Sequence, residues 1–63
     1  MKTGTIREIH RALRADGFQV SEWWIRERVR AGEIPALVSG TRSIISYEVA
    51  REYIEELLTG GKR

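Results

Sequence analysis

The sequence predicts a small, mostly helical α+β domain built from three helices and a β-hairpin. Apolar residues recur at helical spacing in three stretches, and a serine or threonine that can cap a helix precedes each of them. Two short β-prone segments lie between the second and third stretches, on either side of Ser39-Gly40-Thr41. The 63 residues suffice for one small domain, 1–63, whose core is near the lower limit for independent folding.

The first helix is expected at about residues 6–15. Thr5 and Glu8 have the spacing of a capping box, in which each side chain accepts a hydrogen bond from the backbone N–H of the other residue. Asp16-Gly17 supplies the stop, because glycine readily adopts the backbone conformation that ends a helix. One face carries the apolar residues Ile6, Ile9 and Leu13, and the other carries Arg7, Arg11 and Arg14.

The second helix is expected at about residues 22–31, with Ser21 as its N-cap and Gly32 as its stop. Because each residue advances a helix by about 100°, Ile25 and Val29 share one face, which we expect to meet the core. The side chains that face away from it are Trp23, Arg26, Glu27 and Arg30.

A two-stranded wing is expected next, with strands at about residues 34–38 and 42–46. Gly40 permits the tight turn between them. Ser46 can cap a third helix at about residues 47–58. The broad apolar face of that helix comprises Val49, Ala50, Tyr53, Ile54 and Leu57.

Composition limits the chemistry that this chain can perform. Without cysteine it forms neither a disulfide nor a thiolate zinc site, and His10, its one histidine, cannot build a metal site alone. The serines lack the neighbours of a nucleophile, and no glycine-rich loop could cradle a phosphate. We therefore expect no catalytic residue, no metal, no cofactor and no enzymatic activity.

The sequence contains no long apolar run, so we expect neither a signal peptide nor a membrane-spanning helix, and no membrane partner. Together with the lack of cysteine, this pattern favours a cytoplasmic protein. Residues 59–63, which follow the last apolar helix position, are expected to form a frayed tail.

The charges favour a polyanionic partner, although the formal net charge is only +2 at pH 7. Every Lys or Arg except Lys2 and Lys62 is arginine, whose planar fork matches phosphates and guanine edges. Cations outnumber acids in residues 1–30, where the arginines of the first helix are either solvated or follow a phosphate backbone. The third helix is acidic instead, with Glu48, Glu52, Glu55 and Glu56 against Arg51.

An arginine-rich helix followed directly by a β-hairpin is the order of elements in a winged helix-turn-helix DNA-binding domain. Arg26 and Arg30 are four residues apart, so they can present two neighbouring guanidinium groups to guanine edges or phosphates in a major groove. Arg42 follows the wing turn and offers a second cationic contact, with Thr41 beside it. The predicted major-groove residues are Glu22, Trp23, Arg26, Glu27 and Arg30.

Three side chains of the second helix, those of Trp23, Trp24 and Arg28, have two interpretations each. Trp23 either lies against DNA or packs against a neighbouring element or a protein partner. Trp24, near the edge of the buried face, is expected to pack in the core or against the wing, with a DNA-backbone contact as the alternative. Arg28 points sideways and either forms a salt bridge, to Glu22 or Glu33, or clamps a phosphate. The predicted DNA-backbone contacts are Ser21, Trp24 and Arg28.

Over roughly residues 5–57, the chain carries a set of residues at the spacing of a known family. They are Val20-Ser21, Ile25, Val29, Gly32-Glu33-Ile34-Pro35-Ala36, Gly40, Arg42 and Tyr53-Ile54. In these residues the chain resembles the small excisionase-like winged helix-turn-helix proteins, which are related to the DNA-binding head of MerR-type regulators. The resemblance implies major-groove contacts at Trp23, Glu27 and Arg30, and an Arg42 that enters the minor groove.

The chain departs from the family pattern at two places. Bulky Trp23 and Trp24 stand where small or polar residues are usual, and Thr41 replaces a frequent basic residue at the wing tip. Members of the family include phage and transposon excisionases, which bend DNA to steer integrase toward excision, and transcription factors on the same scaffold. The resemblance therefore implies an architectural DNA-binding factor, a recombination directionality factor of a phage or mobile element.

Two alternatives to that function stay open. One is a stand-alone transcriptional regulator of a phage or mobile element, and the other is a protein-binding adaptor anchored by Trp23 and Trp24. The expected partners are double-stranded DNA and, for the architectural function, integrase. The contrast between basic and acidic helices also predicts head-to-tail contacts between copies bound in tandem along DNA.

Overall fold

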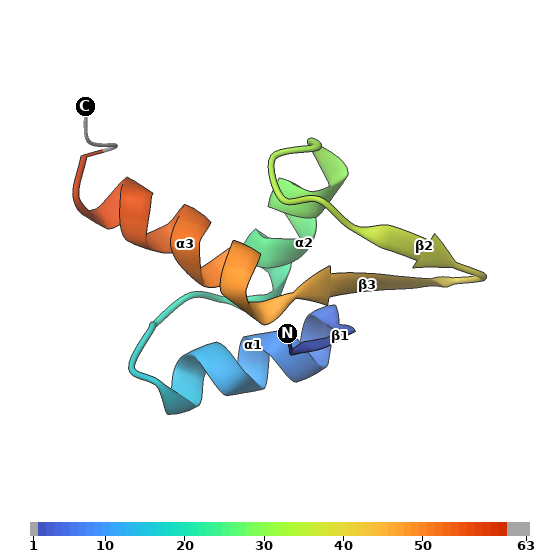
Figure 1. Ribbon diagram of the computed structural model, residues 1–63, viewed down its shortest axis with the longest axis horizontal. Helices are drawn as coiled ribbons and strands as arrows, with labels where there is room; N and C mark the ends of the chain where they lie inside the picture. Colours follow the sequence, from blue (N-terminus) through green and yellow to red (C-terminus); the bar gives the residue numbers. More distant parts are fainter. Residues whose placement is uncertain (1, 61–63) are drawn as a thin grey trace.

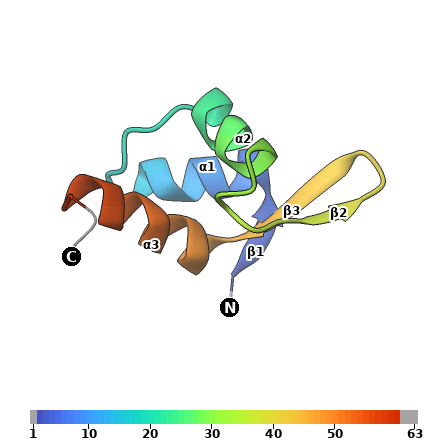
Figure 2. The same ribbon diagram turned by 90° about the horizontal axis from the view of Figure 1, so that it is seen from above.

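The computed structural model describes residues 2–60, in which three helices pack against a small antiparallel sheet. The elements follow in the order β1 (Thr3–Thr5), α1 (Ile6–Ala15), α2 (Glu22–Arg30), β2 (Leu37–Ser39), β3 (Arg42–Ser46) and α3 (Tyr47–Leu58). Figure 1 shows β2 and β3 projecting as a hairpin, while α3 runs toward the opposite end of the molecule. In Figure 2 the tip of the hairpin stands clear of the helices. The α+β class and the three helices expected from the sequence are confirmed.

Side-chain caps fix where the helices begin. Thr5 Oγ1 accepts from the backbone N–H of Glu8 at 3.3 Å, and Thr5 N–H donates to Glu8 Oε1 at 2.9 Å, so the expected capping box is present. Ser21 and Ser46 cap α2 and α3, each accepting from the backbone N–H three residues ahead, at 3.0 and 3.3 Å. The predicted starts of all three helices are correct, and α2 ends at Arg30, one residue before its predicted end.

The expected two-stranded hairpin is present as β2 and β3, but within residues 2–60 the sheet has a third strand that the sequence did not predict, in the order β1-β3-β2. β1 pairs antiparallel with β3, placing Gly4 opposite Ile45. Gly4 is buried against α1, and a Cβ atom at this position would lie 2.6 Å from Glu8 Oε1. The short segment Thr3–Thr5 lacks an alternating apolar pattern, so its strand depends on pairing with a distant part of the chain.

The first strand of the hairpin is also corrected, since β2 begins at Leu37 and not at residue 34. The residues after α2 turn back onto that helix, because the backbone N–H groups of Glu33 and Ile34 donate to Arg28 O at 2.9 and 3.3 Å. Gly32, at φ +82°, provides the left-handed conformation that this helix end requires. Ile34 is then buried in the core, and Pro35 has no N–H for a ladder. The second strand lies at the expected residues, Arg42–Ser46.

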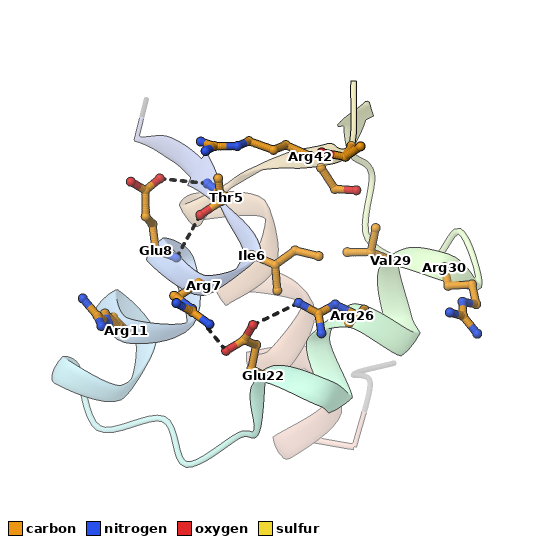
Figure 3. A pocket seen from close by; sticks show the side chains of 12 residues that line it. Thr5, Ile6, Arg7, Glu8, Arg11, Glu22, Arg26, Val29, Arg30 and Arg42 are labelled. Carbon is orange, nitrogen blue, oxygen red and sulfur yellow. Dashed lines mark hydrogen bonds and ion pairs between the residues drawn. The ribbon is translucent and has the colours of Figure 1, made fainter. Parts of the chain in front are cut away.

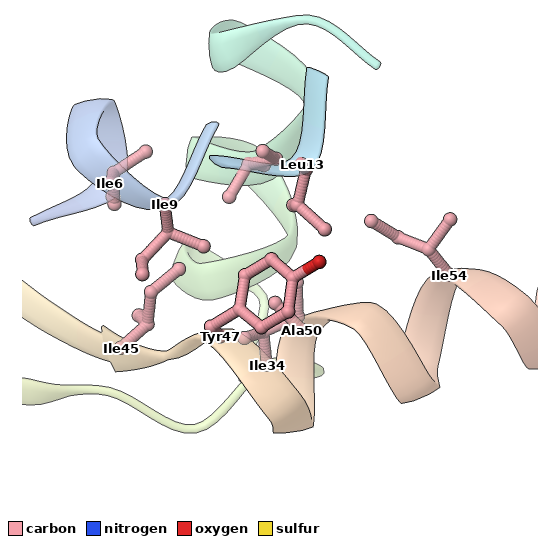
Figure 4. Close-up of a cluster of buried hydrophobic side chains, with 9 residues drawn as sticks. Ile6, Ile9, Leu13, Ile34, Ile45, Tyr47, Ala50 and Ile54 are labelled. Carbon is pink, nitrogen blue, oxygen red and sulfur yellow. The ribbon is translucent and has the colours of Figure 1, made fainter. Parts of the chain in front are cut away.

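The core lies where the three helices meet the sheet (Figure 4). In this view its upper side comes from α1, and its lower side comes from β3 and from α3. Within α2 the buried residue is Ile25, as its place on the helix predicts, while Val29 is half-buried and packs on the core edge. The buried side chains are Ile6, Ile9, Leu13, Ile25, Ile34, Ile45, Tyr47, Ala50 and Ile54.

Of the expected frayed tail, 59–63, the structure describes residues 59 and 60, and residues 61–63 lie outside the described part of the chain. Thr59 is the C-cap of α3 and donates its N–H to Glu55 O at 3.0 Å, and the N–H of Gly60 donates to Leu57 O at 3.3 Å. Over residues 2–60, the helices are too short or too polar for any of them to cross a membrane.

Candidate nucleic-acid interface

An open groove of about 730 Å³ lies between the start of α1, the outer side of α2 and the turn end of the hairpin (Figure 3). Within the described part of the chain its lining contains five arginines and two glutamates, a formal excess of three positive charges. We call this surface the basic groove. It is lined by Thr5, Ile6, Arg7, Glu8, Arg11, Glu22, Arg26, Val29, Arg30, Thr41, Arg42 and Ser43.

Helical spacing places two arginines of α2 in the basic groove. Ile25 turns inward and is 0 % exposed, which leaves Arg26 and Arg30 on the outer side of the helix. Their side chains are 52 % and 75 % exposed, so both guanidinium groups are accessible to a ligand. Ile6 and Val29 add apolar surface to the same groove. The basic groove therefore presents cations beside an apolar surface.

The other arginines reach the groove from both sides of α2. Figure 3 shows Arg7 and Arg11 on α1 and Arg42 on the hairpin, with its side chain directed toward the start of α1. Arg42 pairs with Ser39 at the last register position before the turn. Three separate elements, α1, α2 and the hairpin, thus contribute arginines to one surface.

Glu22 joins two of the groove arginines. Its Oε2 lies 3.0 Å from Arg26 Nη2, and its Oε1 lies 3.9 Å from Arg7 Nε on α1. As the first residue of α2, Glu22 is also stabilised by the positive end of the helix dipole. A second pair lies further along α2, where Glu27 Oε2 is 3.8 Å from Arg30 Nη1.

The structure brings together half of the site residues predicted from the sequence. The groove contains Glu22, Arg26, Arg30, Thr41 and Arg42. Trp23 and Glu27 are on α2 but do not line the groove, and the Trp23 side chain is 66 % exposed. Ser21 serves as the N-cap of α2 through its hydroxyl oxygen.

Trp24 and Arg28 contact the rest of the protein on another side of α2. The Trp24 ring packs against Tyr53 of α3 with centroids 6.2 Å apart, as the packing interpretation expects. Arg28 lies over the Trp24 ring at 5.9 Å, and its Nη1 is 3.4 Å from Glu33 Oε1, the salt bridge that was one of its two interpretations. Tyr53 also donates to Glu33, and this hydrogen bond raises the pKa of the Tyr53 hydroxyl.

Sequence reasoning left Arg7, Arg11 and Ser43 out of the predicted site. Arg7 and Arg11 were recognised as part of an arginine band on the first helix, which is more often only solvated. Their four-residue spacing was visible in the sequence, but their position beside Arg26 depends on how α1 packs on α2. Ser43 had no local signal, because it differs little from any other polar strand residue.

His10 has a structural contact, since its Nε2 lies 2.8 Å from Val20 O and joins α1 to the following loop. Nowhere in residues 2–60 do three His, Cys, Asp or Glu side chains lie close enough to hold a metal ion.

Comparison with family models, with curated proteins and with solved structures found no match.

Proposed function

We propose that this protein is a winged helix-turn-helix module that binds double-stranded DNA. In this proposal α2 enters the major groove, and the turn at residues 39–42 contacts the adjacent minor groove. The observation that carries the proposal is the basic groove, where arginines from α1, α2 and the hairpin lie on one surface. Arginine is well suited to this purpose because it binds phosphates and guanine edges in a bidentate manner.

The arginines suit two kinds of DNA contact. Arg26 and Arg30 lie one turn apart on the exposed side of α2, where they can reach base edges together. Arg7 and Arg11 on α1 can meet phosphates beside the same groove and so fix the position of α2. Exposed Trp23 and neighbouring Glu27 extend the base-facing surface, the former toward a thymine methyl and the latter toward a cytosine amino group.

The favoured biological function is that of an excisionase-like architectural factor, which bends DNA and cooperates with an integrase in a phage or mobile element. A single module of this kind buries only about 600–1,000 Å² of its surface on DNA, so repeated sites or partners are needed for tight binding. A stand-alone transcriptional regulator in the cytoplasm would use the same surface. The alternative of a protein-binding adaptor has less support, because it uses both tryptophans as anchors. Trp24 packs against Tyr53 within the protein, so of the two tryptophans Trp23 is the exposed one.

Head-to-tail contacts between copies are the second part of the proposal. The acidic side chains of α3 lie on a different element from the basic groove, and α3 runs away from the hairpin (Figure 1). A groove arginine of one copy could therefore meet the acidic helix of the next copy along DNA. Footprinting on a fragment with several sites tests this idea, and strictly independent occupancy of each site would contradict it.

Salt dependence of binding tests the DNA-binding proposal. Fluorescence anisotropy would measure the affinity of the whole chain for a mixed-sequence 20-bp duplex between 50 and 200 mM NaCl. If all five groove arginines meet phosphates, the slope of log K against log salt approaches about −4.5, which corresponds to a loss of roughly 500-fold over this range. Affinity that did not change with salt, or no binding at 50 mM, would contradict the proposal.

A further inference from the structure

We propose that Glu22 determines how well the basic groove discriminates between DNA sequences. Its carboxylate holds Arg26 ready for a base edge and weakens the binding of Arg26 and Arg7 to the phosphates of any sequence. The inference rests on the proposed DNA-binding function, and it makes Glu22 a positioning residue that acts through the arginines rather than by contact with a base.

The Glu22 carboxylate has arginine partners on two helices. Its carboxylate lies between guanidinium groups from two helices, with Oε2 3.0 Å from Arg26 Nη2 and Oε1 3.9 Å from Arg7 Nε (Figure 3). The Glu22 side chain is 28 % exposed, compared with 52 % for Arg26 and 71 % for Arg7. The negative charge is therefore less accessible to a ligand than the cations that it holds.

The other acidic residue of the groove has a different partner. Glu8 Oε1 accepts from the backbone N–H of Thr5 at 2.9 Å, which completes the cap of α1. Among the described residues, the groove lining has two acids, Glu8 and Glu22, and of these it is Glu22 that forms ion pairs with groove arginines. Its effect on the local charge is concentrated on Arg26 and Arg7.

The contact to Arg26 leaves part of that guanidinium available. An arginine has five N–H donors in a planar fork, and Glu22 engages Nη2, so the other nitrogens can donate to guanine O6 and N7. A side chain already held by a carboxylate loses less rotamer freedom when it meets a base than a mobile one does. Glu22 therefore favours the base-reading geometry of Arg26.

The same carboxylate opposes contacts that carry no sequence information. Non-specific binding depends on phosphates, and a phosphate that approaches Arg26 or Arg7 also approaches the negative charge of Glu22. Without that charge, both arginines could turn toward the backbone of any duplex. We therefore expect that removing the Glu22 carboxylate strengthens non-specific binding to DNA. Binding to the preferred site should become weaker or stay the same.

The test compares Glu22→Gln with a matched control, Glu55→Gln. Glu55 forms the same type of pair on α3, four residues from Arg51 at 3.2 Å, and is outside the basic groove; duplexes that bind one copy at a time keep the proposed contacts between copies out of the comparison. Both variants change the net charge equally. Each is titrated against two duplexes, a mixed-sequence 20-mer and the consensus that the wild-type chain selects from a randomised library. Circular dichroism checks that each variant remains helical.

We expect Glu22→Gln to bind the mixed-sequence duplex roughly five- to tenfold more tightly than Glu55→Gln, and its ratio of specific to non-specific affinity to fall about tenfold. Glu22→Asp keeps the charge at the start of α2, and hence the fold, but its carboxylate is one methylene shorter and withdraws from Arg26. Its ratio is expected to fall at least threefold, which keeps the test decisive if Glu22→Gln unfolds.

Equal specificity ratios for Glu22→Gln, Glu22→Asp and Glu55→Gln would overturn the inference while leaving DNA binding itself intact. A wild-type chain that bound neither duplex at 50 mM NaCl would instead remove the proposed function, and the inference with it. The two failures are therefore distinguished by the wild-type titration alone.

Discussion

Replacing Arg30 with alanine separates base reading from general attraction to DNA. The Arg30 side chain is 75 % exposed, and its pair with Glu27 is long, at 3.8 Å, so the substitution should change the folding stability by well under about 1 kcal/mol. A bidentate contact to a guanine contributes about 1–3 kcal/mol of discrimination. We therefore expect affinity for the preferred site to fall by roughly 5- to 150-fold, with little change in folding.

The assay for this variant has two parts. Anisotropy titrations compare Arg30→Ala with Arg51→Ala, which removes the same charge from α3, outside the basic groove. Selection from a randomised duplex library then shows whether the preference for one base is relaxed in Arg30→Ala alone. If Arg30→Ala lost no more affinity than Arg51→Ala and selected the wild-type consensus, Arg30 would have no part in base reading.

Two other substitutions test the wing and the core. Arg42→Ala should weaken binding across many sequences, and most strongly on A·T-rich flanks with a narrow minor groove; equal losses on every flank, measured by the same titrations, would argue against minor-groove insertion. Ile25→Ala should lower the free energy of unfolding by about 2–5 kcal/mol in urea titrations, because Ile25 is 0 % exposed and anchors α2 to the core. Leu58→Ala, at a 74 % exposed position, is its control and should change stability by less than about 0.5 kcal/mol; similar losses for both variants would contradict the assigned core.

The helices could be predicted from the sequence because local chemistry determines where they begin. Thr5, Ser21 and Ser46 cap the three helices through contacts within three residues, and such contacts are visible as short sequence patterns. β1 could not be predicted in this way. Its pairing joins Gly4 to Ile45, far apart in the chain, and three residues are too few to show a period.

The start of the hairpin was misjudged for a related reason. The segment around Ile34 is β-prone in composition, but the Ile34 side chain is buried in the core, and the N–H groups of Glu33 and Ile34 donate to Arg28 O at the end of α2. Burial in a core and pairing in a sheet favour the same residue types, so composition alone does not separate them. The strand therefore begins only at Leu37, beyond Pro35.

The candidate site was predictable where it depends on one helix. The inward position of Ile25 places Arg26 and Arg30 on the exposed side of α2, and both line the groove. Arg7 joins them only because α1 packs beside α2, an arrangement that no local pattern contains. The contact of Glu22 to Arg7 on α1 could not be predicted for the same reason, whereas its contact to Arg26 is a local pair four residues apart.

Binding of DNA through α2 and the hairpin is the central claim, and amide chemical-shift mapping tests it most directly. The labelled chain would be titrated with the selected duplex, and resonances would be followed along residues 2–60. We predict that the largest shifts fall on α2, on residues 41–43 and on the start of α1, where the basic groove lies. Shifts confined to the glutamate-rich helix α3, with α2 and the hairpin unchanged, would contradict the claim.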